Sequence, residues 1–185
     1  METPVSDYKK IAGKNSFLLE SVEGGEKIAR FSFIGSNPNK IFKFSDNQDP
    51  FSQLKKILSA YKPVKNPNLP RFQGGLVGYI GYDAVKFIEK IKIKNKANIK
   101  VPLAQLMFAD TLLMFDHIKH KINIVANAFV GKNPEKAYNE AIKKIVAIEK
   151  KLKVSLKSSE FEIPLKGKKP LKVDSNLTRE QYEKM

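Results

Sequence analysis

The most informative segment of this chain reads Ser16-Phe17-Leu18-Leu19-Glu20-Ser21-Val22-Glu23. Its first four residues predict a buried strand, and the polar residues Glu20 and Ser21 follow where that strand leaves the core. A carboxylate beside a hydroxyl offers lone pairs that can hold the ammonium group of an amino acid, while the neighbouring apolar wall takes its side chain. The alternative interpretation is that these two residues only open a loop before Gly24-Gly25.

The sequence around this segment predicts a sheet protein with a few helices. Phe31 and Phe33 alternate with Ser32, and this period of two is typical of a half-buried strand. Strands are predicted at residues 17–19, 29–34, 40–44, 75–81, 107–115 and 121–129. Helices are predicted at residues 50–60, 84–89 and from 133 to about 151. Residues 1–15 are expected to be a polar lead-in, because Thr3-Pro4 and Gly13 interrupt regular structure.

The glycine-rich segment Gln73-Gly-Gly-Leu-Val-Gly-Tyr-Ile-Gly-Tyr-Asp83 does not have the spacing of a nucleotide-binding loop. It lacks both G-x-G-x-x-G and the G-K-[ST] of a P-loop. Glycine in an apolar strand usually marks a bulge or the close approach of another backbone. We therefore expect residues 75–81 to form a central strand crowded by a neighbouring sheet, with a ligand wall as the alternative.

Size and composition indicate one soluble domain or slightly more. The chain has 185 residues and no cysteine, and it shows neither an apolar leader nor a run near the ~20 apolar residues of a membrane span. These features predict a cytoplasmic protein. The net charge of +15 raises the alternative of nucleic-acid binding. Only three cations are arginine, however, and the lysines are scattered, which is more typical of a solvated surface.

The sequence offers no catalytic set and no clear metal site. Asp116, His117 and His120 could in principle bind a metal, but they lie on a predicted tight turn and lack H-E-x-x-H spacing. We expect a polar hairpin tip there. No nucleophile, base and orienting group occur together, so we expect no catalytic residue in this segment.

Several segments, in the same order, resemble the amino-terminal region of the large subunit (component I) of anthranilate synthase, a chorismate-utilising enzyme. They are Phe17-Leu-Leu-Glu-Ser21, Ala29-Arg-Phe-Ser-Phe-Ile-Gly35, Gln73–Asp83, Ala109-Asp-Thr-Leu-Leu-Met-Phe-Asp-His117 and Ser175-Asn-Leu-Thr-Arg-Glu-Gln-Tyr182. The related aminodeoxychorismate synthase subunit of folate synthesis shares the glycine-rich and hairpin segments. The Leu-Leu-Glu-Ser element favours the anthranilate synthase reading over that alternative. A lysine-rich nucleic-acid-binding module is the third reading, and the few arginines and scattered lysines count against it.

The resemblance implies an α+β fold of mainly antiparallel, orthogonally packed sheets with two to three helices. It places a regulatory, scaffolding domain at residues 1–174 and the start of a chorismate-binding catalytic domain at residues 175–185. Thr178-Arg-Glu-Gln181 is a capping-box pattern that opens a helix just before the sequence stops. We therefore expect a truncated chain whose sheets are completed by a missing carboxy-terminal domain.

The resemblance also implies the chemistry of the whole subunit, a lyase that converts chorismate and ammonia into anthranilate and pyruvate for tryptophan biosynthesis. A glutamine amidotransferase subunit would supply the ammonia, and the carboxy-terminal domain would bind chorismate and Mg2+. This segment alone would be inactive and would carry part of the tryptophan feedback site. The implied feedback residues are Glu20 and Ser21, with Arg30 a weaker candidate for carboxylate pairing or for holding Glu20, or else part of an ordinary surface ion pair.

Overall fold

The computed structural model describes residues 3–20, 30–64, 66–91, 100–156 and 175–184. The chain divides into two compact units, Met1–Ser155 and Leu156–Met185. The described part of the second unit carries the short helix α4 (Arg179–Glu183). Its predicted capping box is confirmed, because Gln181 N donates to Thr178 Oγ1 at 3.2 Å and Thr178 N donates to the Gln181 side chain at 2.9 Å. The expected domain boundary after residue 174 remains a prediction.

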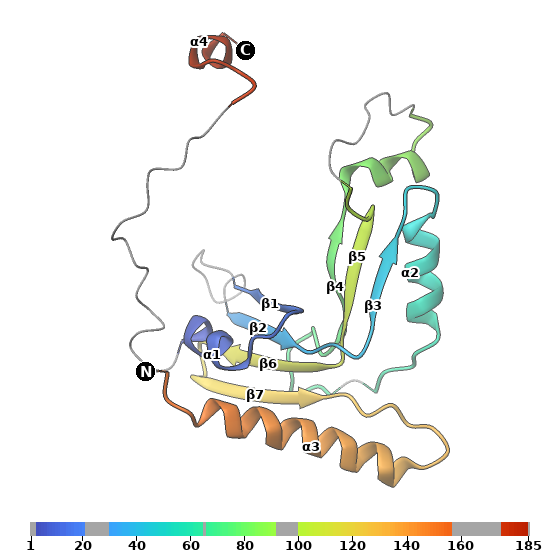
Figure 1. Cartoon of the computed structure of the whole chain (residues 1–185). Coiled ribbons are helices and arrows are strands. Elements are labelled where there is room, and N and C mark those ends of the chain that lie inside the picture. The colour runs from blue at the N-terminus through green and yellow to red at the C-terminus, as the bar shows by residue number, and fades with distance from the viewer. Residues whose placement is uncertain (1–2, 21–29, 65, 92–99, 157–174, 185) are drawn as a thin grey trace. The chain divides into compact units, whose positions relative to one another are not determined.

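The first unit consists of two antiparallel sheets, and the expected α+β class is confirmed (Figure 1). The four-stranded sheet has the order β1-β2-β6-β7, with strands Ser16–Leu19, Phe31–Ser36, Thr111–Asp116 and Lys121–Ala126. The three-stranded sheet has the order β3-β5-β4, with strands Ile41–Phe44, Ala104–Ala109 and Gly75–Ile80. The strands of the two sheets run crosswise in Figure 1.

The chain passes directly from one sheet to the other at Asp110. We expected a single strand over residues 107–115, whereas the structure has β5 before Asp110 and β6 after it. The apolar run continues across this point, so periodicity alone did not reveal the change of sheet. The hairpin between β6 and β7 is confirmed, with Thr111 opposite Ala126 and Asp116 opposite Lys121.

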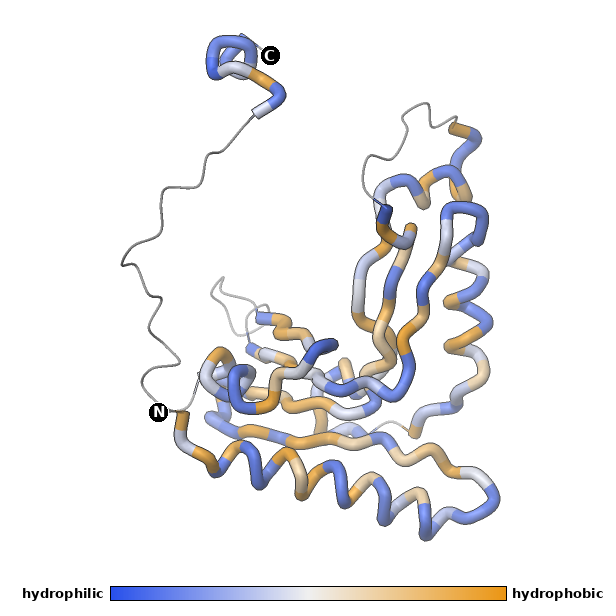
Figure 2. Tube along the Cα trace, viewed as in Figure 1, coloured by the Kyte–Doolittle hydropathy of each residue, from blue (hydrophilic) through white to orange (hydrophobic). Residues whose placement is uncertain are grey.

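Helices cover the outer faces of both sheets. On the four-stranded sheet, α1 (Pro4–Ile11) and α3 (Pro134–Leu152) pack against Ile34, Leu113 and Phe115. On the three-stranded sheet, α2 (Pro50–Ser59) packs its Leu54 and Ile57 against strand residues such as Phe44 and Leu106. Hydrophobic colouring accordingly runs along β6 and β7 in Figure 2, whereas apolar and polar residues alternate within the turns of α3. In the residues that the structure describes, no helix is both long enough and apolar enough to span a membrane.

Helix α1 was not expected, because Thr3-Pro4 was interpreted as an interruption. Thr3 is instead the N-cap, and Pro4 occupies the first turn, where its missing N–H costs nothing. Tertiary contacts stabilise this short helix. Ile11 is buried, and Lys10 Nζ lies 3.2 Å from Asp7 Oδ1 and donates to the Leu152 carbonyl of α3 at 3.0 Å. The lead-in expected at residues 1–15 is therefore wrong over Pro4–Ile11.

The glycine-rich segment forms β4 and the following 3-10 helix η1 (Tyr82–Phe87). Another backbone does approach closely, because a Cβ on Gly78 would lie 2.0 Å from the Gln105 carbonyl oxygen. That oxygen belongs to β5, the paired strand of the same sheet, and not to a neighbouring sheet as we expected. The expected central position is wrong for the described strands, since β4 pairs with β5 alone and forms an edge of its sheet.

Candidate functional site

Glu20 lies at the edge of an open groove between the two sheets. The groove has a volume of about 660 Å³ and is lined on one side by the ends of β1 and β2 and on the other by β4, Phe72 and Leu106. We call it the inter-sheet groove. Its described lining residues are Leu19, Glu20, Phe31, Phe33, Phe72, Leu76, Val77, Gly78, Ile80 and Leu106. The alternative that the glycine-rich strand provides a ligand wall is thus consistent with the position of β4.

Aromatic rings form much of the groove wall. The rings of Phe33 and Phe72 meet edge to face with centroids 5.3 Å apart, and Phe31 lies 6.2 Å from Phe33 in a tilted arrangement. The same side chains extend inward to the core between the sheets, where Phe33 and Phe72 contact the cluster of Ala109, Leu112 and Met114. A planar apolar group could therefore contact aromatic faces and edges in this groove.

Arg30 precedes β2 and forms a two-point ion pair with Asp116 at the end of β6. Arg30 Nε donates to Asp116 Oδ1 at 3.1 Å, and Arg30 Nη2 donates to Oδ2 at 2.8 Å. The guanidinium also lies 4.8 Å from the ring centroid of Phe31, which lines the groove. Arg30 therefore sits beside the groove wall with its charge bound to a carboxylate of the chain.

The Asp116 carboxylate is buried, and its environment favours the ionised form. The hydrogen bonds from the Arg30 side chain are the largest cause and lower the pKa of Asp116 to about 2, against the opposing effect of burial. The Lys119 amide donates a further hydrogen bond to Oδ1 at 3.1 Å. The pair fixes the start of β2 to the end of β6.

The three feedback residues implied by the resemblance have different outcomes. Glu20 is exposed and lines the groove. Ser21 lies outside the described residues. Arg30 forms an ion pair with Asp116, but not the ordinary surface ion pair of the alternative, because the Asp116 carboxylate is buried. Any ligand contact of Arg30 remains a proposal.

We expected Asp116, His117 and His120 to form a solvent-exposed hairpin tip, and the structure agrees with this only in part. Asp116 and Ser32 are buried, and His117 Nε2 shares a hydrogen bond of 2.8 Å with Ser32 Oγ. His120 has a positive φ of 49° in the turn and is exposed. Within the described segments, no three His, Asp or Glu side chains lie close enough together to hold a metal.

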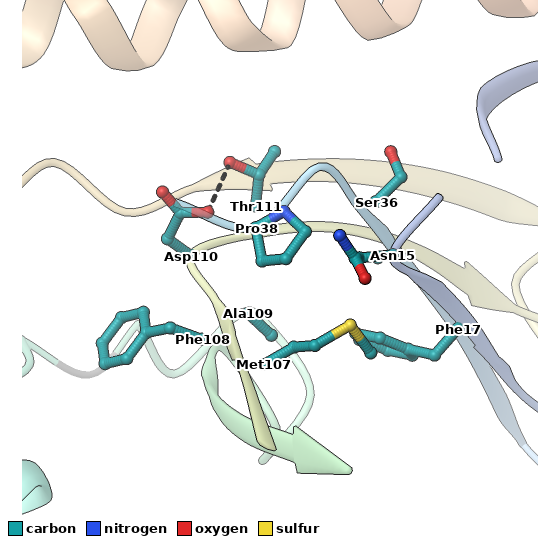
Figure 3. A pocket seen from close by; sticks show the side chains of 10 residues that line it. Asn15, Phe17, Ser36, Pro38, Met107, Phe108, Ala109, Asp110 and Thr111 are labelled. Carbon is teal, nitrogen blue, oxygen red and sulfur yellow. Dashed lines mark hydrogen bonds between the residues drawn. The ribbon is translucent and has the colours of Figure 1, made fainter. Parts of the chain in front are cut away.

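Sequence reasoning missed Phe72 and the polar contacts of Asp110. Phe72 lies in a proline-rich connection, where a bulky aromatic side chain flanked by polar residues was the available signal. Asp110 was the single charged residue inside an apolar run, and it is buried where the chain changes sheets. A small cavity beside it, shown in Figure 3, has a volume of about 10 Å³, which is room for one water molecule at most.

Two antiparallel sheets that open into an aromatic-walled groove with one carboxylate, Glu20, in its described lining define an α+β domain suited to a small, partly apolar ligand. Residues 14–185 match the family described as chorismate binding enzyme, and the chain belongs to this family.

Its similarity to curated relatives extends over nearly the whole chain. Anthranilate synthase component 1 of Acetivibrio thermocellus is 36% identical over 201 residues, a match that covers 98% of this chain and 41% of the relative. The probable anthranilate synthase component 1 of Schizosaccharomyces pombe is 34% identical, with 99% of this chain and 38% of the relative covered. The chain thus spans about two fifths of the length of these relatives.

A solved structure shares the fold. The crystal structure of anthranilate synthase component I from Streptococcus pneumoniae TIGR4 superimposes with a TM-score of 0.57 at 24% identity. The match covers 88% of this chain and 37% of the other. This similarity shows the arrangement of sheets and helices.

Proposed function

We propose that this chain forms the amino-terminal, regulatory part of an anthranilate synthase component 1. The resemblance of the Leu-Leu-Glu-Ser element and the relatives' names support this reading. The observation that carries it is the position of Glu20, a carboxylate at the edge of an apolar groove between two sheets. This arrangement suits an amino acid with a large apolar side chain.

Tryptophan is the proposed ligand of the inter-sheet groove. Its indole ring would lie against Phe31, Phe33 and Phe72, and its ammonium group would bind Glu20 directly or through water. Ser21 would donate or accept at the polar end of the ligand. Arg30 is the weaker candidate for the ligand carboxylate, because its guanidinium already serves Asp116.

Regulation follows if the other wall of the site belongs to a chorismate-binding domain. Tryptophan would then bind one relative arrangement of the two domains better than another, and its differential affinity would shift their equilibrium. A coupling free energy of about 1–3 kcal/mol is enough for a useful change in activity or affinity.

The chemistry itself is assigned to the carboxy-terminal domain of such a subunit. We propose a lyase reaction from chorismate and ammonia to anthranilate and pyruvate, with chorismate and Mg2+ bound by that domain. The proposed partner is a glutamine amidotransferase subunit that releases the ammonia. The segment alone is proposed to be inactive, and the assembly is placed in the cytoplasm.

A joined protein tests the proposal directly. Residues 1–185 would be followed by the carboxy-terminal remainder of the Acetivibrio thermocellus relative, and anthranilate formation from chorismate and ammonia would be followed by its fluorescence. We expect activity that tryptophan inhibits. The unaltered relative serves as the positive control, and the 185-residue chain alone should be inactive.

The product formed and the response to tryptophan distinguish the proposed function from its alternatives. A folded joined protein that makes anthranilate without responding to tryptophan would contradict the regulatory assignment. Conversion of chorismate to aminodeoxychorismate by the protein in its native host would favour the folate-pathway subunit instead. Binding to RNA or DNA that persists at moderate salt and prefers one sequence would favour the nucleic-acid alternative.

A further inference from the structure

Both direct passages of the chain between the two sheets lie at one corner of the domain. The β5–β6 passage is Asp110 itself, and the β2–β3 passage contains Asn39. The Asn39 side chain donates to Asp110 Oδ2, and the Phe108 amide donates to the Lys40 carbonyl at 2.9 Å. The two passages are thus tied directly to each other.

Asp110 is the centre of this corner. It is 3% exposed, and Lys144 of α3 places its Nζ 2.6 Å from Asp110 Oδ2. Thr111 Oγ1 lies 3.5 Å from Oδ1, the contact drawn as a dashed line in Figure 3. A buried carboxylate needs such partners, because removing it from water without them is costly.

Asn127, which follows β7, connects the same corner to the entry of β4. The backbone N–H of Asn127 donates to the Asp110 backbone carbonyl at 2.8 Å, and the side-chain Nδ2 of Asn127 donates to the Gln73 backbone carbonyl at 2.8 Å. Gln73 is adjacent to Phe72, one of the aromatic walls of the inter-sheet groove. The hydrogen bonds of the corner therefore reach Gln73, the residue next to Phe72 of the groove wall.

The groove has one wall on each sheet, so its opening depends on how the sheets are placed relative to each other. Phe31 and Phe33 belong to the four-stranded sheet, whereas Leu76 and Val77 belong to the three-stranded sheet. The apolar contacts between the sheets are non-directional, but the hydrogen bonds at the corner are directional. The corner is therefore the part of the interface best able to specify one placement.

We propose that Asp110 is a positioning residue: held by Asn39, Lys144 and Asn127, it sets the relative placement of the two sheets and thereby the opening of the inter-sheet groove. Asp110 does not line the groove and would act through its walls. The identity of the ligand affected, tryptophan, rests on the proposed function, whereas the effect on sheet placement does not.

Distance measurements between the sheets test this proposal without any ligand. The chain has no cysteine, so spin labels can be attached to cysteines introduced at the exposed positions Lys43 on β3 and Lys121 on β7. Double electron–electron resonance would compare the labelled chain with its Asp110→Asn and Lys144→Met variants. The matched control is Lys153→Met at the C-cap of the same helix, which removes the exposed Lys153–Glu149 ion pair.

We expect Asp110→Asn and Lys144→Met to shift or broaden the distance distribution and Lys153→Met to leave it unchanged. Folding would be checked by circular dichroism. If Asp110→Asn does not fold, the distance distribution of Lys144→Met tests the proposal, because Lys144 is partly solvated. Unchanged distances in folded variants would overturn the proposal, since a role in stability alone predicts lower melting temperature without a change in placement.

The joined protein provides the functional readout. Lys144→Met should raise the tryptophan concentration for half inhibition about tenfold, with little change in the uninhibited rate. If the unaltered joined protein ignores tryptophan, the proposed function fails, and the distance distributions still decide the role of Asp110. If the distances change while tryptophan inhibition keeps its midpoint, the link from sheet placement to ligand binding is wrong.

Discussion

Glu20 brings the single charged side chain to the described lining of an otherwise apolar groove. Neutralising it by Glu20→Gln keeps its size and removes its attraction for a ligand ammonium. A hydrogen bond to a charged group contributes about 1.5–3 kcal/mol. We therefore expect the tryptophan concentration for half inhibition of the joined protein to rise roughly tenfold or more. Inhibition curves of anthranilate formation measure this change.

The control for Glu20 is Glu89→Gln, an exposed carboxylate that does not line the groove. Its inhibition curve should match that of the parent protein. Ser21→Ala is expected to act in the same direction as Glu20→Gln. Unchanged sensitivity in a folded Ser21→Ala variant would remove that hydroxyl from the site.

The Arg30–Asp116 pair predicts a defined dependence of stability on pH. Pairing lowers the pKa of Asp116 from 3.8 to about 2, so its contribution is fully present above about pH 4 and disappears as pH falls toward 2. Arg30→Gln should reduce the free energy of unfolding by about 1–2 kcal/mol near neutral pH. The difference from the parent chain should narrow between pH 4 and 2, as followed by urea unfolding.

Lys153→Met is a suitable comparison for Arg30→Gln, because it breaks an ion pair whose side chains are both exposed. Exposed pairs contribute about 0–1 kcal/mol, so this variant should stay close to the parent throughout. An Arg30→Gln penalty that is the same at acid and neutral pH would show that the loss comes from packing on Phe31 and not from the charge on Asp116.

At the scale of the element, β4 depends on a glycine that meets its neighbour closely. The missing side chain of Gly78 leaves room for the Gln105 carbonyl, which would lie 2.0 Å from a Cβ. Gly78→Ala must displace the β4–β5 pairing, and overpacking of this kind costs about 1–3 kcal/mol. Gly131→Ala is the control, because a Cβ there meets nothing within 4 Å. Equal midpoints of thermal unfolding for the two variants would contradict this account.

Helix α1 packs its apolar side chain Ile11, which is 1% exposed, into the core of the four-stranded sheet. Truncation by Ile11→Ala should lower the free energy of unfolding by about 2–5 kcal/mol, as for other buried aliphatic residues. Val5→Ala on the exposed side of the same helix should have little effect. A small loss at Ile11 would mean that α1 is a dispensable attachment to the sheet. Urea unfolding of the two variants measures the difference.

Sequence-based prediction found the elements with a clear hydrophobic periodicity and missed the features that have none. Alternation of Phe31 and Phe33 with Ser32 identified the strand predicted at 29–34, although Ser32 and Ile34 are its fully buried residues and the two phenylalanines are half-buried. Helical spacing identified the helices predicted at 50–60 and from 133 to about 151, which correspond to α2 and α3. Helix α1 was missed, since eight residues carry little periodicity and Pro4 has opposite meanings inside a helix and at its first turn. The change of sheet at Asp110 has no periodic signature at all.

At the scale of the whole molecule, the candidate site was predictable only in part. Glu20 and Ser21 were both singled out because they follow an apolar strand, and the resemblance assigned both to the feedback site. The structure places Glu20 on the groove lining, and the ligand role of both residues remains a prediction. Phe72, Leu106 and β4 join the groove only through the crossing of two sheets, which depends on contacts between residues far apart in sequence. The corner around Asp110 is likewise assembled from four separate segments and helix α3.

The openness of the inter-sheet groove leads to the last prediction, which concerns the isolated chain. Specific small-molecule sites bury about 70–90% of their ligand, but this groove presents walls of only two sheets and holds about 660 Å³ of open space. Tryptophan bound here would keep much of its indole ring in water. Calorimetry should therefore detect no binding to the 185-residue chain at concentrations that saturate the joined protein. Micromolar affinity of the isolated chain, about −8 kcal/mol, would show that the groove is already complete and that a second domain adds no wall to it.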